Sequence, residues 1–187
     1  MLVNDLVKDI TPSELEGLKV TFINMPLRES ALPNTPPEGP LILAAILRKF
    51  GAETHLIDLN AYRITDDNAS RRGLPNGRHL SYSEAEQMFL KHLNNVGDQD
   101  IVAFSGKITT LRWQEEMAQI VRKHQPDTFI VSGNGLATEI RMGLFNWIPE
   151  LDGIARSEGD DAILIIARDA KLIKERGWAG AINSGKL

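Results

Sequence analysis

Cysteine is absent from the 187 residues of this sequence. Its absence excludes disulfide bonds, thiolate-held zinc, iron–sulfur clusters bound by the chain's own thiolates, and every cysteine nucleophile. Histidine is scarce as well, and His55, His79, His92 and His124 are too scattered to suggest metal ligands. The sequence therefore predicts no metal centre built from its own side chains.

The sequence also lacks a basic surplus and a long apolar run. Lysine and arginine number 21 against 25 aspartates and glutamates, a net charge of −4, which disfavours nucleic-acid and anionic-membrane partners. No apolar run approaches the roughly 20 residues that span a bilayer. Residues 1–17 have neither the basic start nor the apolar stretch of a signal peptide. We expect a cytoplasmic protein with no membrane partner.

Short apolar and β-branched runs, which are typical of buried strands, alternate with helical patterns along the chain. The runs cover 19–24, 53–58, 100–105, 128–132 and 151–155. Helices are expected over 40–50, 81–96, from 110, over 137–146 and over 157–171, with capping boxes at 11–14 and 81–84. Strands of four to six residues between helices predict a doubly wound α/β fold. The expected architecture is a five-stranded parallel sheet with helices on both faces, flavodoxin-like or Rossmann-like.

The sequence divides into three parts. Residues 1–17 are expected to form an N-terminal helical extension, 18–171 the α/β domain, and 172–187 a C-terminal tail or small hairpin. The all-apolar run 163–166 predicts a last helix that is buried on more than one side, and core packing and a docking surface explain it equally well. Residues 59–80 are polar and rich in turn residues, so we expect a long connection there.

Ligands of open α/β sheets bind outside the carboxyl ends of the strands. The loop 25–38 at that edge is longer than an ordinary connection, which is typical of a functional loop. Gly133-Asn134-Gly135 follows the fourth run, and these residues tolerate positive φ and close approach of a ligand. Lys107 follows the third run, where it could hold an anionic group.

Several familiar sites do not fit these loops. Gly106-Lys107-Ile108 lacks the serine or threonine and the upstream glycine of a P-loop, and Gly133-x-Gly135 lacks the third glycine of a dinucleotide fingerprint. Asn24 and Ser105 stand where a phospho-acceptor receiver domain would need acids. His79 alone cannot complete a catalytic triad. We therefore expect no catalytic residue in this chain.

Four segments in order carry a resemblance to a known family. They are Asn24–Arg28 with Pro36–Arg48, Asp100–Ser105, Val131–Thr138 and Leu151–Asp160. Together they resemble the cobalamin-binding domain at the N-terminus of cobalamin-dependent radical SAM enzymes. The likeness spans residues 18–170, most of the chain.

The resemblance implies a flavodoxin-like domain that holds the corrin ring above the carboxyl edge of the sheet, with the nucleotide tail along the loops after the third and fourth strands. It assigns cofactor-binding residues in three groups. Those expected along the tail are Ser105, Lys107, Thr109, Gly133, Asn134 and Gly135. Pro26, Leu27 and Gly39 are expected to approach the corrin, and Glu158 and Gly159 to close the far side.

Two departures from related proteins shape the expected function. The loop after the first strand has no histidine, so the resemblance implies methylcobalamin held base-off, without a histidine below the cobalt. A radical SAM barrel needs cysteines, and this chain has none. The implied role is a cobalamin-binding module of a methyltransferase, with its barrel in a partner protein or in a C-terminal domain missing from this sequence.

Two other functions stay open at this point. The same fold could bind a flavin or a nucleotide at the point where the strand order reverses. It could also serve as a ligand-free interaction domain that presents an apolar surface to a partner.

Overall fold

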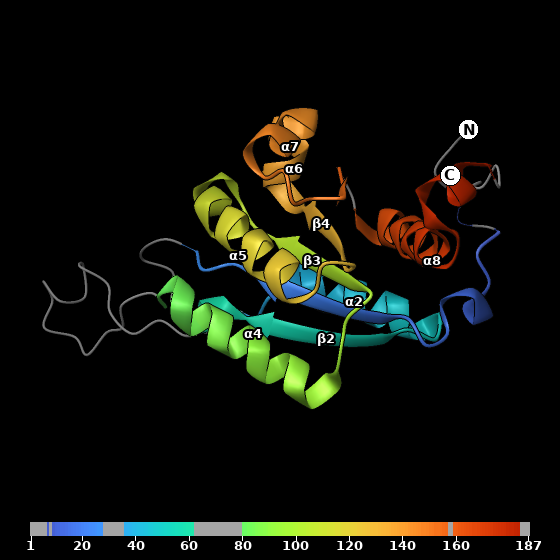
Figure 1. Ribbon diagram of the computed structural model, residues 1–187, viewed down its shortest axis with the longest axis horizontal. Coiled ribbons are helices and arrows are strands. Elements are labelled where there is room, and N and C mark those ends of the chain that lie inside the picture. The colour runs from blue at the N-terminus through green and yellow to red at the C-terminus, as the bar shows by residue number, and fades with distance from the viewer. Residues whose placement is uncertain (1–6, 8, 28–35, 62–79, 157–158, 184–187) are drawn as a thin grey trace, which may run out of the picture.

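Five parallel strands form the centre of the molecule (Figure 1). The computed structural model describes residues 7, 9–27, 36–61, 80–156 and 159–183. The strands are β1 (Lys19–Asn24), β2 (Glu53–Asp58), β3 (Ile101–Ser105), β4 (Phe129–Gly133) and β5 (Gly153–Ile154). Their order is β2-β1-β3-β4-β5, and every neighbouring pair runs parallel. This is the flavodoxin-like order. The fold predicted from the sequence is confirmed.

Helices connect the strands and cover the sheet. The α-helices are α2 (Glu38–Lys49), α4 (Tyr82–Val96), α5 (Leu111–His124), α6 (Asn134–Ile140), α7 (Leu144–Trp147) and α8 (Gly159–Asn183). Short 3-10 turns are η1 (Pro12–Leu15), η2 (Leu59–Ala61), η3 (Ile108–Thr110) and η4 (Arg141–Gly143). The predicted capping box at the start of α4 is present, because Ser81 Oγ accepts from the Glu84 backbone N–H at 3.2 Å. Of the described helices, none has both the length and the apolar character to cross a membrane.

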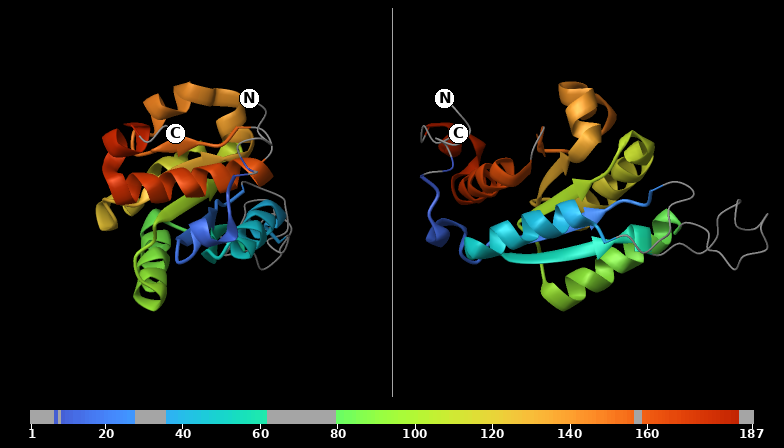
Figure 2. Two further views of the ribbon diagram at one scale, coloured as in Figure 1. Left: turned by 90° about the vertical axis from the view of Figure 1, so that its right-hand side faces the viewer. Right: turned by 180° about the vertical axis from the view of Figure 1, so that it is seen from behind.

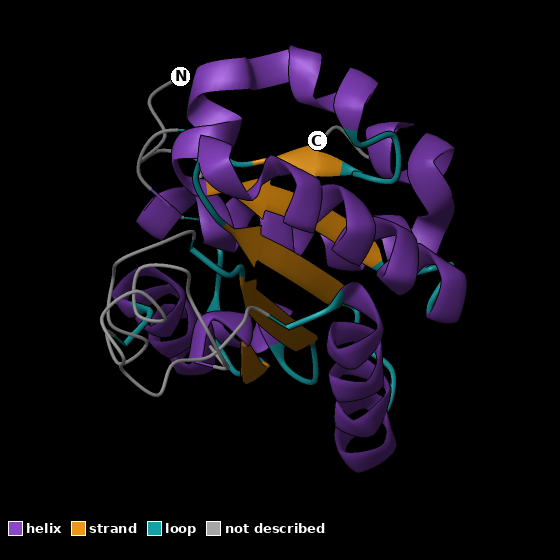
Figure 3. Cartoon of the chain, turned by 90° about the vertical axis from the view of Figure 1, so that its left-hand side faces the viewer, coloured by secondary structure: helices purple, strands orange, loops and turns teal. Residues whose placement is uncertain are grey.

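The sheet separates two apolar layers, because successive side chains of a strand point to opposite faces. Val102 and Ile130 pack with α4 and α5 on one face. Ala103 and Val131 pack with α2 and α8 on the other. Figure 2 shows α2 and α8 turned to the viewer when the molecule is seen from behind, and Figure 3 shows the strands running between helices.

The apolar run 163–166 lies in the second of these layers. Ile163 and Leu164 are buried, and Ile165 and Ile166 are partly buried against the same cluster. Core packing within the described chain therefore takes up part of this apolar surface.

Two sequence predictions about helices are wrong. The expected single helix over 137–146 is divided into α6, η4 and α7, and Arg141 has a φ of 57°, which interrupts a helix. Residues 172–183, expected to belong to a C-terminal tail or small hairpin, instead continue α8, which runs to Asn183. Gly177 breaks the helix with a φ of 67°, but the chain then resumes helical structure and buries Ala181. Residues 184–187 lie outside the described part.

Two further segments differ in extent from the expectation. Only two residues of the fifth predicted strand, Gly153 and Ile154, pair with β4. The long connection expected over 59–80 begins with the turn η2, and 62–79 lie outside the described residues.

The N-terminal stretch packs onto the α/β domain. Ile10 and Leu15 are buried in the same cluster as Ala167 and Ala170 of α8. Lys171 Nζ donates to the carbonyl oxygen of Glu14 at 2.8 Å. The beginning of the described chain therefore contributes to the layer that contains its last helix.

Candidate ligand-binding site

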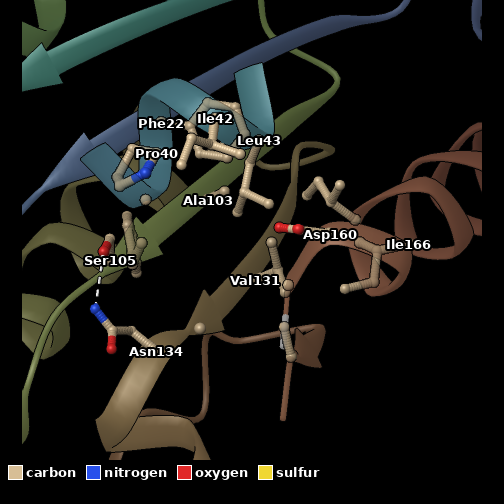
Figure 4. Close-up of a pocket in the computed structure, with 16 residues that line it drawn as sticks. Phe22, Pro40, Ile42, Leu43, Ala103, Ser105, Val131, Asn134, Asp160 and Ile166 are labelled. Carbon is tan, nitrogen blue, oxygen red and sulfur yellow. Dashed lines mark hydrogen bonds between the residues drawn. The ribbon is translucent and has the colours of Figure 1, made fainter. Parts of the chain in front are cut away.

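A cavity of about 390 Å³ lies between the sheet, α2 and the start of α8 (Figure 4). Its floor is one row across the three central strands, because Phe22 pairs with Ala103 and Ala103 pairs with Val131. Each of these residues stands two positions before the last residue of its strand, and all three are buried. The cavity therefore reaches below the edge where ligands of such sheets bind.

The walls of the cavity are apolar and come from two helices. Pro40, Ile42 and Leu43 project from the first turns of α2, and Ile163 and Ile166 from α8. Ligand pockets of several hundred Å³ with apolar walls and a few polar groups are typical of cofactor sites. The arrangement suits a flat, largely apolar ring.

The rim carries the polar groups. Ser105 and Gly133 end β3 and β4 and pair in register, and Asn134 follows them at the start of α6. Asn134 Nδ2 donates to Ser105 Oγ at 3.4 Å, a long hydrogen bond that a ligand could replace. Asn134 has a φ of 70°, and its Oδ1 accepts from the Gly135 N–H at 2.7 Å. Asparagine tolerates this conformation better than most residues.

Gly159 allows the two helical walls to come close together. A Cβ placed on Gly159 would lie 3.2 Å from Leu43 Cδ2, tighter than ordinary contacts. Any side chain here would therefore push α8 and α2 apart or force Leu43 to move. The small residue sets the distance between the walls.

Five of the residues that the sequence analysis assigned to a cofactor line this one cavity. They are Gly39, Ser105, Gly133, Asn134 and Gly159.

Five other assigned residues do not line the cavity. Pro26 is buried, and the Leu27 N–H donates to Asn60 Oδ1 at 2.8 Å away from the cavity lining. Lys107 and Thr109 are exposed at η3, and Gly135 lies in the first turn of α6. None of these five lines the cavity, and Glu158 falls outside the described residues.

Sequence reasoning missed the floor and the helical walls. It searched the loops after the strands, whereas Phe22, Ala103 and Val131 lie within the strands and look like any core residue. Only the run 163–166 carried a signal, since it marked a helix with more apolar surface than one face requires.

A tight polar cluster fixes the loop after β3. The fully buried Gln114 accepts a hydrogen bond from Ser132 Oγ at 2.6 Å, while its Nε2 has no partner among the described residues. Thr110 Oγ1 donates to the Lys107 carbonyl oxygen at 2.8 Å. Gly106 lies directly against both side chains, so the chain beyond Ser105 is held closely over α5.

The described histidines lie away from the cavity. His92 is within 2.8 Å of Thr21 Oγ1, and burial lowers the pKa of its imidazole, with a smaller contribution from His55. His124 contacts Glu86 at 2.6 Å. Over the described ranges, no cluster of three or more histidine, cysteine, aspartate or glutamate residues could hold a metal ion. The described residues that line the cavity include no histidine.

Comparisons with known proteins give little beyond the architecture. No family model matches the sequence, and no curated protein matches it. The chain is similar in structure to azoreductase AzrA, with 14% identity and a TM-score of 0.37, over 84% of this chain and 99% of that one. It is similar to an azoreductase from Bacillus anthracis str. Sterne, with 13% identity and a TM-score of 0.38, over the same shares. At these TM-scores the likeness does not extend to a site or an activity.

Proposed function

We propose that this chain is a cobalamin-binding module whose cavity receives the flat base of the cofactor's nucleotide tail. One observation carries the proposal. Residues from four separate segments that resemble the cobalamin-binding family, Gly39, Ser105, Gly133–Asn134 and Gly159, meet at a single apolar cavity.

The residues of the cavity fit such a group. A base is flat and largely apolar. Ala103 in the floor of the cavity and Leu43 and Ile163 in its walls offer apolar surfaces for it. Ser105 and Asn134 at the rim supply a hydroxyl and an amide for the ribose–phosphate part of the tail. The corrin ring would then lie over the rim.

Nothing in the sequence of the loop 25–38 could place an imidazole below the cobalt, since it contains no histidine. The cofactor, when bound, supplies a cobalt-centred methyl carrier. Methyl transfer would require a radical SAM barrel from a partner protein or a further domain, because this chain has no cysteine to hold an iron–sulfur cluster. The chain's own residues would bind and orient the cofactor, and the assembly would act in the cytoplasm.

A second candidate ligand is a flavin or another nucleotide. It is favoured by the strand order, because the direction in which the chain adds strands to the sheet reverses between β1 and β3, and residues of both strands form the cavity floor. An isoalloxazine or purine ring has the same flat shape as the base of cobalamin.

A retention experiment separates these candidates. The purified chain is incubated separately with hydroxocobalamin, methylcobalamin, FMN and ATP, desalted, and examined by absorption spectroscopy. About one equivalent of retained corrin supports the cobalamin module. If the chain retains FMN or ATP but no corrin, the second candidate replaces the cobalamin proposal. If the chain retains none of the four compounds, the function that remains is an interaction domain without a ligand.

A pair of neighbouring residues on α2 tests whether the cavity is the binding site. Ile42 and Leu41 are exposed by 53% and 42%, but only Ile42 lines the cavity. We expect Ile42→Glu to weaken cobalamin binding at least tenfold, about 1.4 kcal/mol, because a carboxylate replaces an apolar wall. Leu41→Glu is the matched control and should bind as the parent does. Equal affinities for the two variants would place the ligand elsewhere.

A further inference from the structure

Gln114 of α5 carries a buried amide that the fold satisfies only in part. The side chain is fully buried, and its Oε1 accepts a hydrogen bond from Ser132 Oγ of β4 at 2.6 Å. Its Nε2 has no hydrogen-bond partner among the described residues. A buried donor without a partner costs stability, so its presence requires an explanation.

Packing alone does not require an amide at this position. Met117, Ala118 and Val121 of the same helix are buried in the apolar cluster against the sheet. A methionine has nearly the length of a glutamine and would fill the same space without an unpaired donor. The amide is therefore better explained by what it contacts than by the volume it occupies.

Gln114 contacts the ends of the two strands that form the polar rim of the cavity. Ser132 directly precedes Gly133, and Gly133 pairs in register with Ser105. On its other side, a Cβ placed on Gly106, the residue after Ser105, would lie 2.7 Å from Gln114 Nε2. The amide thus lies against both strand ends.

These contacts come from the face of the sheet opposite the cavity. Side chains alternate along a strand, and Val131 belongs to the cavity floor, so Ser132 is directed toward α5. Gln114 does not line the cavity. At the rim, Ser105 and Asn134 are joined by a long hydrogen bond of 3.4 Å (Figure 4), which by itself holds them weakly. Their relative placement therefore depends on support from behind the sheet.

Resting on the proposed function, we infer that Gln114 is a positioning residue for the nucleotide tail of the cofactor. It holds the ends of β3 and β4 at the spacing that places Ser105 and Asn134 against the ribose–phosphate part of the tail. An apolar replacement keeps the core filled but releases the two strand ends from this geometry. Small displacements of positioning groups are sufficient to weaken their contacts with a ligand.

The test replaces both members of the buried pair, since removing only one would leave the other without a partner. The double variant, Gln114→Met with Ser132→Ala, is compared with the parent chain and with Gln119→Met, a control at an exposed position of the same helix. Equilibrium binding is measured for hydroxocobalamin and for cobinamide, which lacks the nucleotide tail. The thermal unfolding midpoint of each protein is recorded.

We expect the double variant to unfold at the midpoint of the parent or above it, because the unpaired donor is removed together with its hydrogen-bonded partner. It should bind hydroxocobalamin about tenfold more weakly, since the tail loses about one well-placed hydrogen bond at the rim. It should bind cobinamide as the parent does. Gln119→Met should match the parent in all three measurements.

Each other result overturns the inference in a distinguishable way. Parent-like binding of hydroxocobalamin by the double variant removes the positioning role and leaves the proposed function intact. An equal loss for hydroxocobalamin and cobinamide shows that the effect does not lie at the tail. A midpoint well below that of the parent shows that the pair serves the fold. If the parent chain itself binds no hydroxocobalamin, the proposed function fails and the inference fails with it.

Discussion

Gly106 follows the last residue of β3, and its Cα lies directly against two side chains of the following turn and helix. A Cβ at this position would overlap Thr110 Oγ1 and approach Gln114 Nε2 to 2.7 Å. Both side chains are buried and hydrogen-bonded, so neither can easily move away. The absence of a side chain at Gly106 therefore fixes the path of the loop that leaves Ser105.

Gly106→Ala tests this role. We expect the substitution to lower the free energy of unfolding by about 1–3 kcal/mol, because it forces extra volume into a packed site. Urea unfolding measures the change. Gly135→Ala is the control, since a Cβ there meets no atom within 4 Å and alanine suits a helix better than glycine. An unchanged stability for Gly106→Ala would mean that the loop shifts freely.

The sequence predicted site residues where a residue ends a strand or lies in the first turn of the helix that follows. Ser105 and Gly133 could be found because carboxyl ends of parallel strands mark the binding edge. Ala103 could not, because a small buried residue in an apolar strand has no pattern that separates cavity from core. Lys107 shows the opposite failure, since its position suggested a ligand contact but its side chain is exposed outside the cavity.

At the scale of elements, Arg122 of α5 holds the short strand β5 against the rest of the sheet. Its guanidinium donates to the carbonyl oxygens of Thr128 at 2.9 Å and Glu150 at 2.7 Å, and to Asp152 Oδ2 at 2.7 Å. Asp152 Oδ2 also accepts from the Ile130 N–H at 2.8 Å. One side chain thus links α5, the start of β4 and the turn before β5.

We expect Arg122→Ala to destabilise the chain by about 2–3 kcal/mol, because several hydrogen bonds to a charged group are lost and their acceptors are left partly buried. Thermal and urea unfolding measure the loss. Arg112→Ala is the matched control on the same helix, since Arg112 is exposed and its ion pairs with Glu115 and Glu116 lie at the surface. A loss no larger than that of the control would show that β5 is held by other contacts.

Element boundaries were less predictable than element types, for physical reasons found in individual residues. Gly177 has the positive φ expected of a helix end, yet Trp178 lies tilted against Phe129 of β4 with ring centroids 6.3 Å apart. This tertiary contact and the burial of Ala181 favour a second helical segment over the hairpin. The helix end predicted at residue 171 is not the break that the structure shows at Gly177, and packing decided what followed that break.

For the whole molecule, the alternation of strands and helices was sufficient to predict the fold. Parallel strands need crossovers on the faces of the sheet, and the right-handed rule leaves few arrangements. The order β2-β1-β3-β4-β5 is one of them. The arrangement of α2 beside α8 over the cavity was not predictable in the same way, because it depends on side-chain volumes at Gly159 and Leu43.

The stability of the molecule should depend on pH through His92. His92 Nε2 lies 2.8 Å from Thr21 Oγ1, which donates a hydrogen bond to Gln99. The ring of His55 lies edge-on to the ring of His92, with centroids 5.3 Å apart, and His55 also contacts Glu53. Burial first and His55 second lower the pKa of His92 below its ordinary value of 6.5. The unfolded chain therefore binds the proton more readily, so stability is full above pH 6.5 and decreases as the pH falls toward the lower folded pKa.

Urea unfolding between about pH 7.5 and 5.5 checks this expectation, a range above the titration of ordinary carboxylates. The parent chain should lose stability toward the acidic end. His92→Gln keeps a side-chain donor for Thr21 but cannot be protonated, so its stability should vary less over the same range. His124→Gln is the control, because His124 is a histidine of α5 that contacts Glu86 of α4. Parallel curves for the parent and His92→Gln would contradict the assignment.

The two helical walls of the cavity come from opposite ends of the α/β domain, α2 following the first strand and α8 following the last. During synthesis, the strands and α2 leave the ribosome well before α8 does. The cavity cannot close until that final helix has emerged and docked. A chain cut short before α8 would therefore lack one of the two helical walls of the cavity.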